Sequence, residues 1–405
     1  MAASAISISE NMTDTPRSNR YHIAIFGRRN AGKSSLVNAI AGQQVSIVSD
    51  VAGTTTDTVW KNIELPQVGA AVIGDTAGYD DVGTLGSMRV DSARKAVARI
   101  DLAIMLLSAG SEDTSMEKEW MALFEKAGVP VICLLGKSDG DLRSSLSSWE
   151  RALGCKVHAF SSATGEGREQ LLSLIAEYHK KDSNIDDITH TLVKAGDTVL
   201  LVMPQDAQAP QGRLILPQVQ TLRNLLDKHC LAFCCAPEEL PQMLASLKEP
   251  PSLVITDSQV FAQVEKAIPA ASRLTSFSVL MARHKGDIDS FRAGADALLA
   301  LPPNARILIA EACSHIPQNE DIGRVKLPRL LRKHFGDGVV VEVVSGNDFP
   351  ADLTPYDIVI HCGACMFTRR HVMSRLRQAR AQGVPITNYG IAIAALTGIL
   401  PKVVY

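Results

Sequence analysis

Short apolar runs alternate with amphipathic stretches along most of the chain. Within residues 21–180 the apolar runs are YHIAIF, AAVIGD, LAIMLLS, VPVICLLG and KVHAF, and the amphipathic segment SSLVNAIAG follows the first of them. Apolar runs of this length between turn signals are typical of buried strands, and their alternation with helical patterns predicts a parallel sheet. The pattern therefore predicts an α/β domain over residues 21–180, closed by a helix near 167–180.

The same alternation continues after a charged stretch, KKDSNIDDITH, which predicts a linker near residues 180–190. A second group of predicted strands contains DTVLLVMP, LAFCCA and SLVITD, and a third contains ILIAEAC, GVVVEVV and YDIVIHC. We predict a middle domain over residues 190–270 and a third domain over residues 271–405, both with doubly wound, Rossmann-like parallel sheets. Residues 1–20 are polar throughout and are predicted to form a disordered tail rather than a signal peptide.

Composition narrows the class of protein. The chain has 405 residues, of which 46% are hydrophobic, and its 41 basic and 43 acidic residues give a net charge of -2. Without a basic excess, nucleic acid is not expected to be the main partner. No apolar run is long enough to span a bilayer, and the eight cysteines are too few for a disulfide scaffold. We therefore expect a cytoplasmic protein that does not bind membranes.

Residues 27–34 match the phosphate-binding pattern G-x-x-x-x-G-K-S/T between a predicted strand and a predicted helix. Glycines let successive backbone N–H groups point at an anion, and the helix N-terminus adds positive potential. Lys33 is expected to reach the β- and γ-phosphates, and Ser34 is expected to ligate Mg²⁺. The predicted nucleotide-binding residues of this loop are Gly27, Asn30, Ala31, Gly32, Lys33, Ser34 and Ser35.

Further motifs indicate that the nucleotide is GTP or GDP. Asp75-Thr-Ala-Gly78 follows the predicted strand AAVIG, so Asp75 can hold Mg²⁺ and the Gly78 N–H can meet the γ-phosphate. Thr55 lies in the segment where a threonine ligand of Mg²⁺ is required, and Asp139 can accept two hydrogen bonds that guanine offers and adenine does not. The predicted catalytic residues are Lys33, Thr55, Asp75 and Gly78, and the predicted base-contacting residues are Lys137, Asp139, Ser162 and Ala163.

These motifs resemble those of the TrmE/Era/EngA-type GTPases. The segments GRRNAGKSS, GTTTD, DTAG, GKSD and SAT carry the resemblance. Two positions depart from it: Gly136 replaces the usual Asn of the guanine motif, and Tyr79 stands where Ras-like proteins carry a water-orienting Gln. The resemblance implies that Asn30 binds a K⁺ ion that does the work of an arginine finger. The alternative for Asn30 is an amide that only stabilises the loop.

A second signal consists of cysteines and histidines that follow two predicted strands. Cys313 and His315 follow ARILIAEA, and His361, Cys362 and Cys365 follow YDIVI. Strand ends of a doubly wound sheet line one crevice, so the two groups can converge. Three thiolates and one imidazole suit a 4Fe-4S cluster with one replaceable ligand. A Cys₃His zinc site, a redox pair of cysteines and buried structural cysteines are the alternatives.

The combination of this pattern with a GTPase domain resembles the FeFe-hydrogenase maturation GTPases, the HydF family. The resemblance implies a GTPase domain, a dimerisation domain and a cluster-binding domain, with Cys313, Cys362 and Cys365 as cluster ligands and His315 or His361 near the fourth iron. It also implies a homodimeric scaffold that passes a transient two-iron cluster precursor to apo-FeFe-hydrogenase, with radical-SAM maturation proteins as further partners.

Two other functions use parts of the same evidence. A tRNA-modification GTPase would share the N-terminal motifs, but the near-zero net charge argues against it. A zinc-stabilised regulatory GTPase would share both groups of motifs. The remaining cysteines fall on predicted strands and are interpreted as core residues, namely Cys133, Cys155, Cys230, Cys234 and Cys235.

Overall fold

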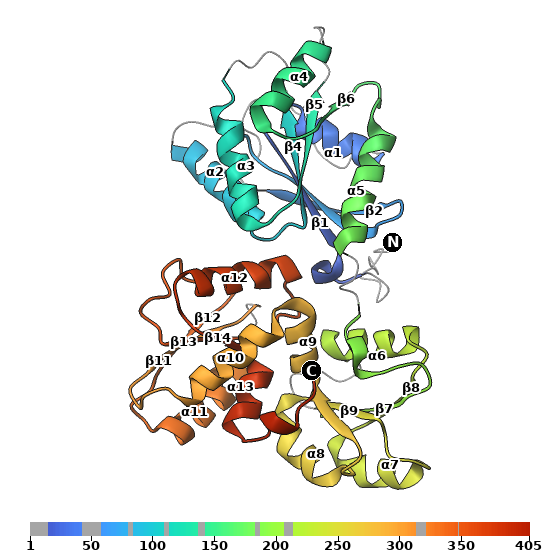
Figure 1. Cartoon of the computed structure of the whole chain (residues 1–405), viewed down its shortest axis with the longest axis vertical. Coiled ribbons are helices and arrows are strands. Elements are labelled where there is room, and N and C mark those ends of the chain that lie inside the picture. The colour runs from blue at the N-terminus through green and yellow to red at the C-terminus, as the bar shows by residue number, and fades with distance from the viewer. Residues whose placement is uncertain are drawn as a thin grey trace, which may run out of the picture. The chain divides into compact units, whose positions relative to one another are not determined.

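The computed structural model describes residues 15–42, 58–79, 84–108, 113–136, 142–182, 187–205, 214–312, 321–346 and 348–405. The chain divides into two compact units, Met1–Ser183 and Asn184–Tyr405 (Figure 1). Every strand pair is parallel except one, in the described part of the chain. The prediction of an α/β protein with mostly parallel sheets is therefore confirmed.

The N-terminal unit contains a six-stranded sheet in the order β2-β3-β1-β4-β5-β6. Its strands are β1 (Tyr21–Gly27), β2 (Val59–Leu65), β3 (Gly69–Asp75), β4 (Leu102–Leu107), β5 (Val131–Gly136) and β6 (Val157–Phe160). The edge strand β2 runs antiparallel to β3 and was not predicted from the sequence pattern. Its side chains are mostly exposed or half-buried, so it lacks the continuous apolar run of the central strands.

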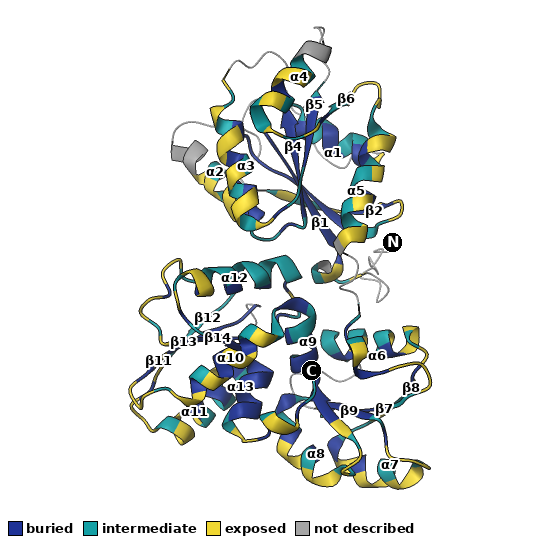
Figure 2. Cartoon of the chain, viewed as in Figure 1, coloured by how far each residue is buried: buried dark blue, intermediate teal, exposed yellow. Residues whose placement is uncertain are grey.

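Helices cover both faces of this sheet (Figure 1). Side chains of α1 (Lys33–Ala41) and α5 (Arg168–Asp182) form one buried cluster with the sheet. Side chains of α2 (Thr84–Val97), α3 (Ser115–Ala127) and α4 (Leu142–Leu153) form another on the opposite face. The central strands are buried between the two layers, as Figure 2 shows, which explains their uninterrupted apolar sequences.

The C-terminal unit contains two four-stranded parallel sheets. The first has the order β10-β9-β7-β8 and the second β12-β11-β13-β14. The strands of the first are β7 (Thr198–Val202), β8 (Leu231–Cys235), β9 (Leu253–Thr256) and β10 (Arg273–Ser276). The strands of the second are β11 (Arg306–Ala310), β12 (Val340–Val344), β13 (Ile358–His361) and β14 (Ile386–Asn388). The helices are α6 (Leu216–Asp227), α7 (Leu240–Ser246), α8 (Phe261–Ala267), α9 (Phe277–Lys285), α10 (Ile288–Leu299), α11 (Leu327–Phe335), α12 (Arg369–Ala381) and α13 (Tyr389–Leu396).

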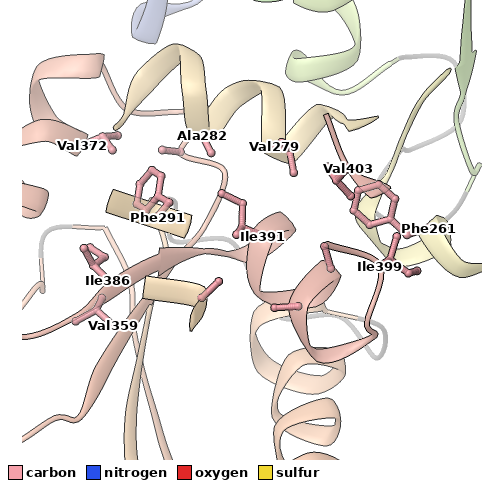
Figure 3. Close-up of a cluster of buried hydrophobic side chains, with 14 of the residues drawn as sticks. Phe261, Val279, Ala282, Phe291, Val359, Val372, Ile386, Ile391, Ile399 and Val403 are labelled. Atoms are coloured by element: carbon pink, nitrogen blue, oxygen red, sulfur yellow. The ribbon is translucent and has the colours of Figure 1, made fainter. Parts of the chain in front are cut away.

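One hydrophobic cluster joins these two sheets. Val254 of β9 and Val359 of β13 belong to the same set of buried side chains, together with Val279 of α9, Phe291 of α10 and Ile391 of α13. Figure 3 shows Val279, Phe291 and Ile391 of these helices in this cluster, together with Val359 of the second sheet. Val403, near the C-terminal end, also forms an isolated bridge with Leu274 of β10, so the end of the chain returns to the first sheet. Residues 184–405 therefore form one compact unit, and the predicted division near residue 270 stays a prediction.

The cysteines in β8 and just before it correct one expectation. Cys230 is buried as expected, but Cys234 is exposed and Cys235 is only partly buried. The reason is that β8 lies at the edge of its sheet, where an apolar sequence does not ensure burial.

Candidate functional site

The phosphate-binding loop connects β1 directly to α1. β1 ends at Gly27 and α1 begins at Lys33, and Asn30 and Gly32 between them have left-handed φ angles of 58° and 91°. Glycine adopts such an angle readily, and Asn does so more readily than most residues. A Cβ atom on Gly27 would lie 2.6 Å from the carbonyl oxygen of Leu106 on β4. The loop thus has the strand–loop–helix context that its motif requires.

Lys33, Ser34 and Asp75 gather at this loop. The Lys33 Nζ atom donates hydrogen bonds to the carbonyl oxygens of Gly27 at 3.0 Å and Arg28 at 2.9 Å. The Ser34 hydroxyl donates to Asp75 Oδ2 at 2.5 Å. Burial raises the pKa of Asp75, while the hydrogen bond from Ser34 and the charge of Lys33 oppose that increase. A hydroxyl and a carboxylate at this position are oxygen ligands that suit Mg²⁺ beside a nucleotide.

The chain beyond Asp75 packs against the phosphate-binding loop. A Cβ atom on Gly78 would lie 2.7 Å from the backbone nitrogen of Arg29, so a larger residue would have to push the two segments apart. The Tyr79 side chain is buried, its hydroxyl donates to Glu117 Oε1 at 2.9 Å, and its ring stacks on Trp120. Tyr79 is therefore a core residue on the α3 side of the sheet, and we assign it no role in orienting water.

An ion pair that the sequence analysis did not predict holds the same loop. Arg28 donates from Nε and Nη2 to the two carboxylate oxygens of Glu117, at 2.6 and 3.0 Å. Burial favours a raised pKa for Glu117, but the hydrogen bonds from Arg28 and Tyr79 outweigh it and the pKa lies below its usual value. Glu117 lies three residues before Trp120, on the buried face of α3. An acidic residue on a buried helix face needs a partner, so this position could have indicated the ion pair from the sequence.

The predicted guanine-binding residues are only partly within the described residues. Ser162 and Ala163 are exposed in the turn after β6, where the Gly165 N–H donates to the Ser161 carbonyl oxygen at 2.9 Å. Gly136, the last residue of β5, is paired with Phe160, the last residue of β6. Lys137, Asp139 and the predicted Mg²⁺ ligand Thr55 lie outside the described residues. These base and metal contacts stay predictions.

The cysteine site lies where two neighbouring strands end. Ala310 at the end of β11 is paired with His361 at the end of β13. Cys362 follows β13 directly, and Cys365 lies in the turn before α12. Cys313 and His315 are outside the described residues, but Ala312, just before them, donates its N–H to Cys362 Sγ at 3.0 Å. Ala312, the last described residue before Cys313, therefore lies beside Cys362, and the convergence of Cys313 with Cys362 and Cys365 stays a prediction.

The turn at Cys362–Cys365 directs backbone N–H groups at sulfur. Cys362 Sγ accepts a second hydrogen bond from the Ala364 N–H at 3.4 Å, and Ala364 has a left-handed φ angle of 53°. Burial raises the pKa of Cys365, and the charge of Lys285 with the N–H groups of Cys365 and Met366 opposes this increase. Hydrogen bonds to sulfur stabilise metal-bound thiolates. These two cysteines therefore fit the predicted cluster.

Lys285, the last residue of α9, hydrogen-bonds to the backbone of this cysteine turn. Its ammonium group is buried and donates to the carbonyl oxygens of Phe367 at 2.8 Å, Ala364 at 3.1 Å and Cys365 at 3.2 Å. Burial lowers the pKa of Lys285 to about 8, and the negative potential of Cys365 and Cys362 opposes the decrease. A buried ammonium is stable only with hydrogen bonds and a compensating charge. Thiolates, or an anionic cluster that they hold, would supply that charge.

His361 has a different setting from the cysteines. Its ring is buried, with Nδ1 2.9 Å from the carbonyl oxygen of Cys362 and Nε2 3.0 Å from Arg375 Nη1. Because the carbonyl only accepts and the guanidinium only donates, Nδ1 carries the proton and Nε2 accepts. Burial and the charge of Arg375 lower the pKa of His361 to about 3. Iron binding through Nε2 would therefore require Arg375 to move away. The role of His361 as a ligand stays a prediction.

Two negative findings apply to the described residues. Among them, no group of three or more His, Cys, Asp and Glu side chains is arranged to hold a metal ion. One of the three cysteines of the predicted cluster, Cys313, lies outside those residues. The finding therefore tests neither an iron site nor a zinc site at these cysteines. In the described part of the chain, no helix has the length and apolar character needed to cross a bilayer.

Comparison with protein families distinguishes between the functions that the sequence motifs suggested. Residues 188–286 match the model of the hydrogen maturase F dimerization domain, and residues 289–405 match the hydrogen maturase F tetramerization domain. The chain belongs to the hydrogen maturase F family. Residues 22–137 match a model described as a 50S ribosome-binding GTPase, so this hydrogen maturase F chain begins with a P-loop GTPase domain for which GTP or GDP and Mg²⁺ are the expected ligands. The tetramerization description adds an association that the sequence analysis did not predict.

Curated relatives of this hydrogen maturase F chain resemble its GTPase domain. The tRNA modification GTPase MnmE of Endomicrobium trichonymphae is 37% identical over 164 residues, which cover 38% of this chain and 34% of that protein. The GTPase Der of Kosmotoga olearia is 36% identical over 171 residues, which cover 38% of each protein. The chain thus spans about a third of the length of these relatives. A solved structure of an Era variant from Aquifex aeolicus bound to GDP and aluminium fluoride is 18% identical, with a TM-score of 0.36, and the match covers 53% of this chain and 92% of that one.

Proposed function

We propose that this chain is a GTP-hydrolysing maturation factor that holds a 4Fe-4S cluster and delivers a two-iron precursor to apo-FeFe-hydrogenase. The observation that carries the proposal is the Cys362–Cys365 turn, clamped by a buried lysine inside the hydrogen maturase F regions and joined in one chain to a GTPase domain. The proposed partners are apo-hydrogenase and the radical-SAM proteins that would build the precursor.

The GTPase reaction that we propose is attack of water on the γ-phosphate. Lys33 would neutralise charge on the phosphates, while Ser34, Asp75 and Thr55 would hold Mg²⁺. The chain has little proton transfer to perform, because phosphoryl transfer depends mainly on positioning and charge neutralisation. With Tyr79 in the core, we expect slow turnover. Ordering of the loops around the γ-phosphate would then control contacts with partner proteins.

The cluster would be held by Cys313, Cys362 and Cys365. When bound, it would supply a replaceable coordination position for the two-iron cargo. The N–H groups of Ala312 and Ala364 would stabilise the Cys362 thiolate. His315 is the better candidate of the two histidines for the fourth position, because both ring nitrogens of His361 already have partners.

Potassium should accelerate GTP hydrolysis relative to sodium. We propose that Asn30, exposed in the phosphate-binding loop, binds K⁺, which would offset phosphate charge in place of an arginine finger. The measurement is phosphate release in KCl and NaCl at equal ionic strength. Asn30→Ala should remove the difference between the salts without removing GTP binding. Equal rates of the wild-type protein in the two salts would contradict a K⁺ site.

The edge strand β8 is the proposed dimer contact. Leu231 and Phe233 are large apolar side chains with exposed fractions of 57% and 37%, on an edge strand within the region that matches a dimerization domain. An exposed apolar edge pairs readily with a second copy. Phe233→Glu should therefore shift the protein toward smaller assemblies in size-exclusion chromatography with light scattering. Val59→Glu, at an exposed apolar position on the edge strand β2, is the matched control and should leave the assembly unchanged.

Lys285→Met should weaken cluster retention. The change keeps the length of the side chain but removes the positive charge and the hydrogen bonds that Lys285 donates to three carbonyl oxygens, of which that of Ala364 still accepts from the Phe367 N–H. Each buried polar group left without a partner costs about 1–3 kcal/mol. We expect anaerobic gel filtration to strip iron from this variant several-fold more than from the wild type. Lys285→Arg should retain more iron, and Lys248→Met, at an exposed position, should behave as the wild type. Wild-type iron retention by Lys285→Met would show that its charge is unnecessary.

The proposed function is tested by anaerobic reconstitution of the full-length chain, followed by loading with precursor and mixing with apo-FeFe-hydrogenase. Hydrogenase activation together with bound iron and sulfide is the expected result. A colourless protein with one zinc per chain would favour a regulatory GTPase. High-affinity tRNA binding in a filter assay would favour a tRNA-modification GTPase. Iron binding without hydrogenase activation would support the cluster site but contradict the proposed delivery role.

A further inference from the structure

Two cysteines outside the cluster site face each other in the GTPase unit. Cys133 is buried on β5, and Cys155 lies partly buried in the turn between α4 and β6. Their sulfur atoms are 3.5 Å apart and share a hydrogen bond, although the residues are 22 positions apart in the sequence. A disulfide bond is about 2.0 Å long, so the sulfurs would have to approach by roughly 1.5 Å to form one. The two thiols are thus arranged as a potential disulfide pair.

We propose that Cys133 and Cys155 form a reversible disulfide on exposure to a peroxide, and that this bond lowers the affinity of the GTPase domain for GTP. The sequence interpretation of both residues as simple core cysteines is the alternative. Cys155 differs from a core cysteine because it lies in a turn after Gly154, outside the strand, and is accessible to a small oxidant.

The environments of the two thiols determine which of them reacts first with the oxidant. The hydrogen bond from Cys133 lowers the pKa of Cys155, whereas that same bond and burial raise the pKa of Cys133. The more accessible Cys155 is therefore the attacking thiolate, and Cys133 is the resolving thiol.

The reaction balances with hydrogen peroxide as the oxidant. The Cys155 thiolate attacks one peroxide oxygen, the O–O bond breaks, and a sulfenic acid and hydroxide form. Hydroxide takes up the proton that Cys155 released and becomes water. The Cys133 sulfur then attacks Cys155 Sγ and displaces the sulfenic oxygen, which leaves as a second water with the Cys133 proton. Two thiols lose two electrons, and one peroxide becomes two waters.

The position of the pair connects its oxidation to nucleotide binding. Cys133 is paired in the sheet with Val157, the first residue of β6. β5 ends at Gly136, where the predicted guanine motif begins, and β6 ends just before the turn that carries Ser162 and Ala163. The Val157 N–H donates to Glu150 Oε1 of α4 at 3.2 Å, so a displaced Cys155 turn would pull on the start of β6. A disulfide would therefore strain the two strands that lead to the predicted base contacts.

The test uses the full-length chain, treated with hydrogen peroxide and then alkylated. Trypsin can cleave at Lys137, Arg143 and Arg151 between the two cysteines, so a linked peptide pair identifies the bond by mass spectrometry. We expect this linkage and a several-fold rise in the dissociation constant of a fluorescent GTP analogue, both reversed by dithiothreitol.

Cys155→Ser separates this effect from oxidation of the other cysteines. The residue is partly exposed, so serine should be tolerated, and peroxide should no longer change GTP affinity. Cys133→Ala, which keeps the buried position apolar, should give the same result. The proposal is overturned if no linked peptide forms, if the linked protein binds GTP as tightly as the reduced protein, or if peroxide weakens GTP binding equally in Cys155→Ser.

Discussion

Lys33→Ala should reduce GTP hydrolysis by about 10²-fold or more, because one positioned charge at the transferring phosphate contributes that much to catalysis. Lys33 is the first residue of α1, and its Nζ atom lies against the carbonyl oxygens of the phosphate-binding loop. Ser34→Ala should have a similar effect, since it removes a Mg²⁺ ligand. The measurement is phosphate release under saturating GTP.

Lys126→Ala, at an exposed position near the end of α3, provides the control and should hydrolyse GTP normally. The iron content of Lys33→Ala should equal that of the wild type, because the two sites lie in different compact units. Normal hydrolysis by Lys33→Ala would mean that the reaction takes place at another site. A parallel loss of iron would point to misfolding of the whole chain.

Cys362→Ser and Cys365→Ser should each abolish the cluster. A 4Fe-4S cluster with three cysteine ligands contains about four irons per chain, and loss of one thiolate should leave less than about one. The measurement is iron and sulfide content after anaerobic reconstitution, with an EPR spectrum of the reduced protein. We expect the same result for Cys313→Ser. Cys234→Ser, at an exposed cysteine of β8, is the matched control.

The histidine variants make the prediction more specific. His315→Ala and His361→Ala should retain iron, because water can replace imidazole at the fourth position. The variant that removes the bound histidine should alter the EPR signal. If Cys362→Ser and Cys365→Ser bind iron as the wild type does, the cluster lies elsewhere and the proposed scaffold role fails, while the GTPase assignment is unaffected.

Local sequence patterns predicted the elements that depend on short segments. The phosphate-binding loop required only the glycines and Lys33 between a strand and a helix, and the cysteine turn required only its position after an apolar strand. The antiparallel strand β2, the four-residue strand β10 and the three-residue strand β14 were missed. The first carries polar residues at a sheet edge, and the other two are too short to show a period.

Contacts between distant segments could not be predicted in the same way. Glu117 is 89 residues from Arg28, and Lys285 is 79 residues from Ala364. Nothing in the local sequence distinguishes Lys285 from the solvent-exposed lysines, because its burial results from packing of α9 against the cysteine turn. The core position of Tyr79 likewise depends on Glu117 and Trp120 of α3.

The shared hydrophobic cluster of the C-terminal unit makes the two hydrogen maturase F regions inseparable. A cut at residues 287–288 would remove Lys285 from the cysteine turn and break the hydrogen bond from Ser278 to Asn388. It would also uncover apolar side chains of both sheets, such as Val254 and Val359. Either half expressed alone would expose an aggregation-prone surface. Residues 184–405 should therefore be expressed as a single piece when this part of the chain is studied without the GTPase domain.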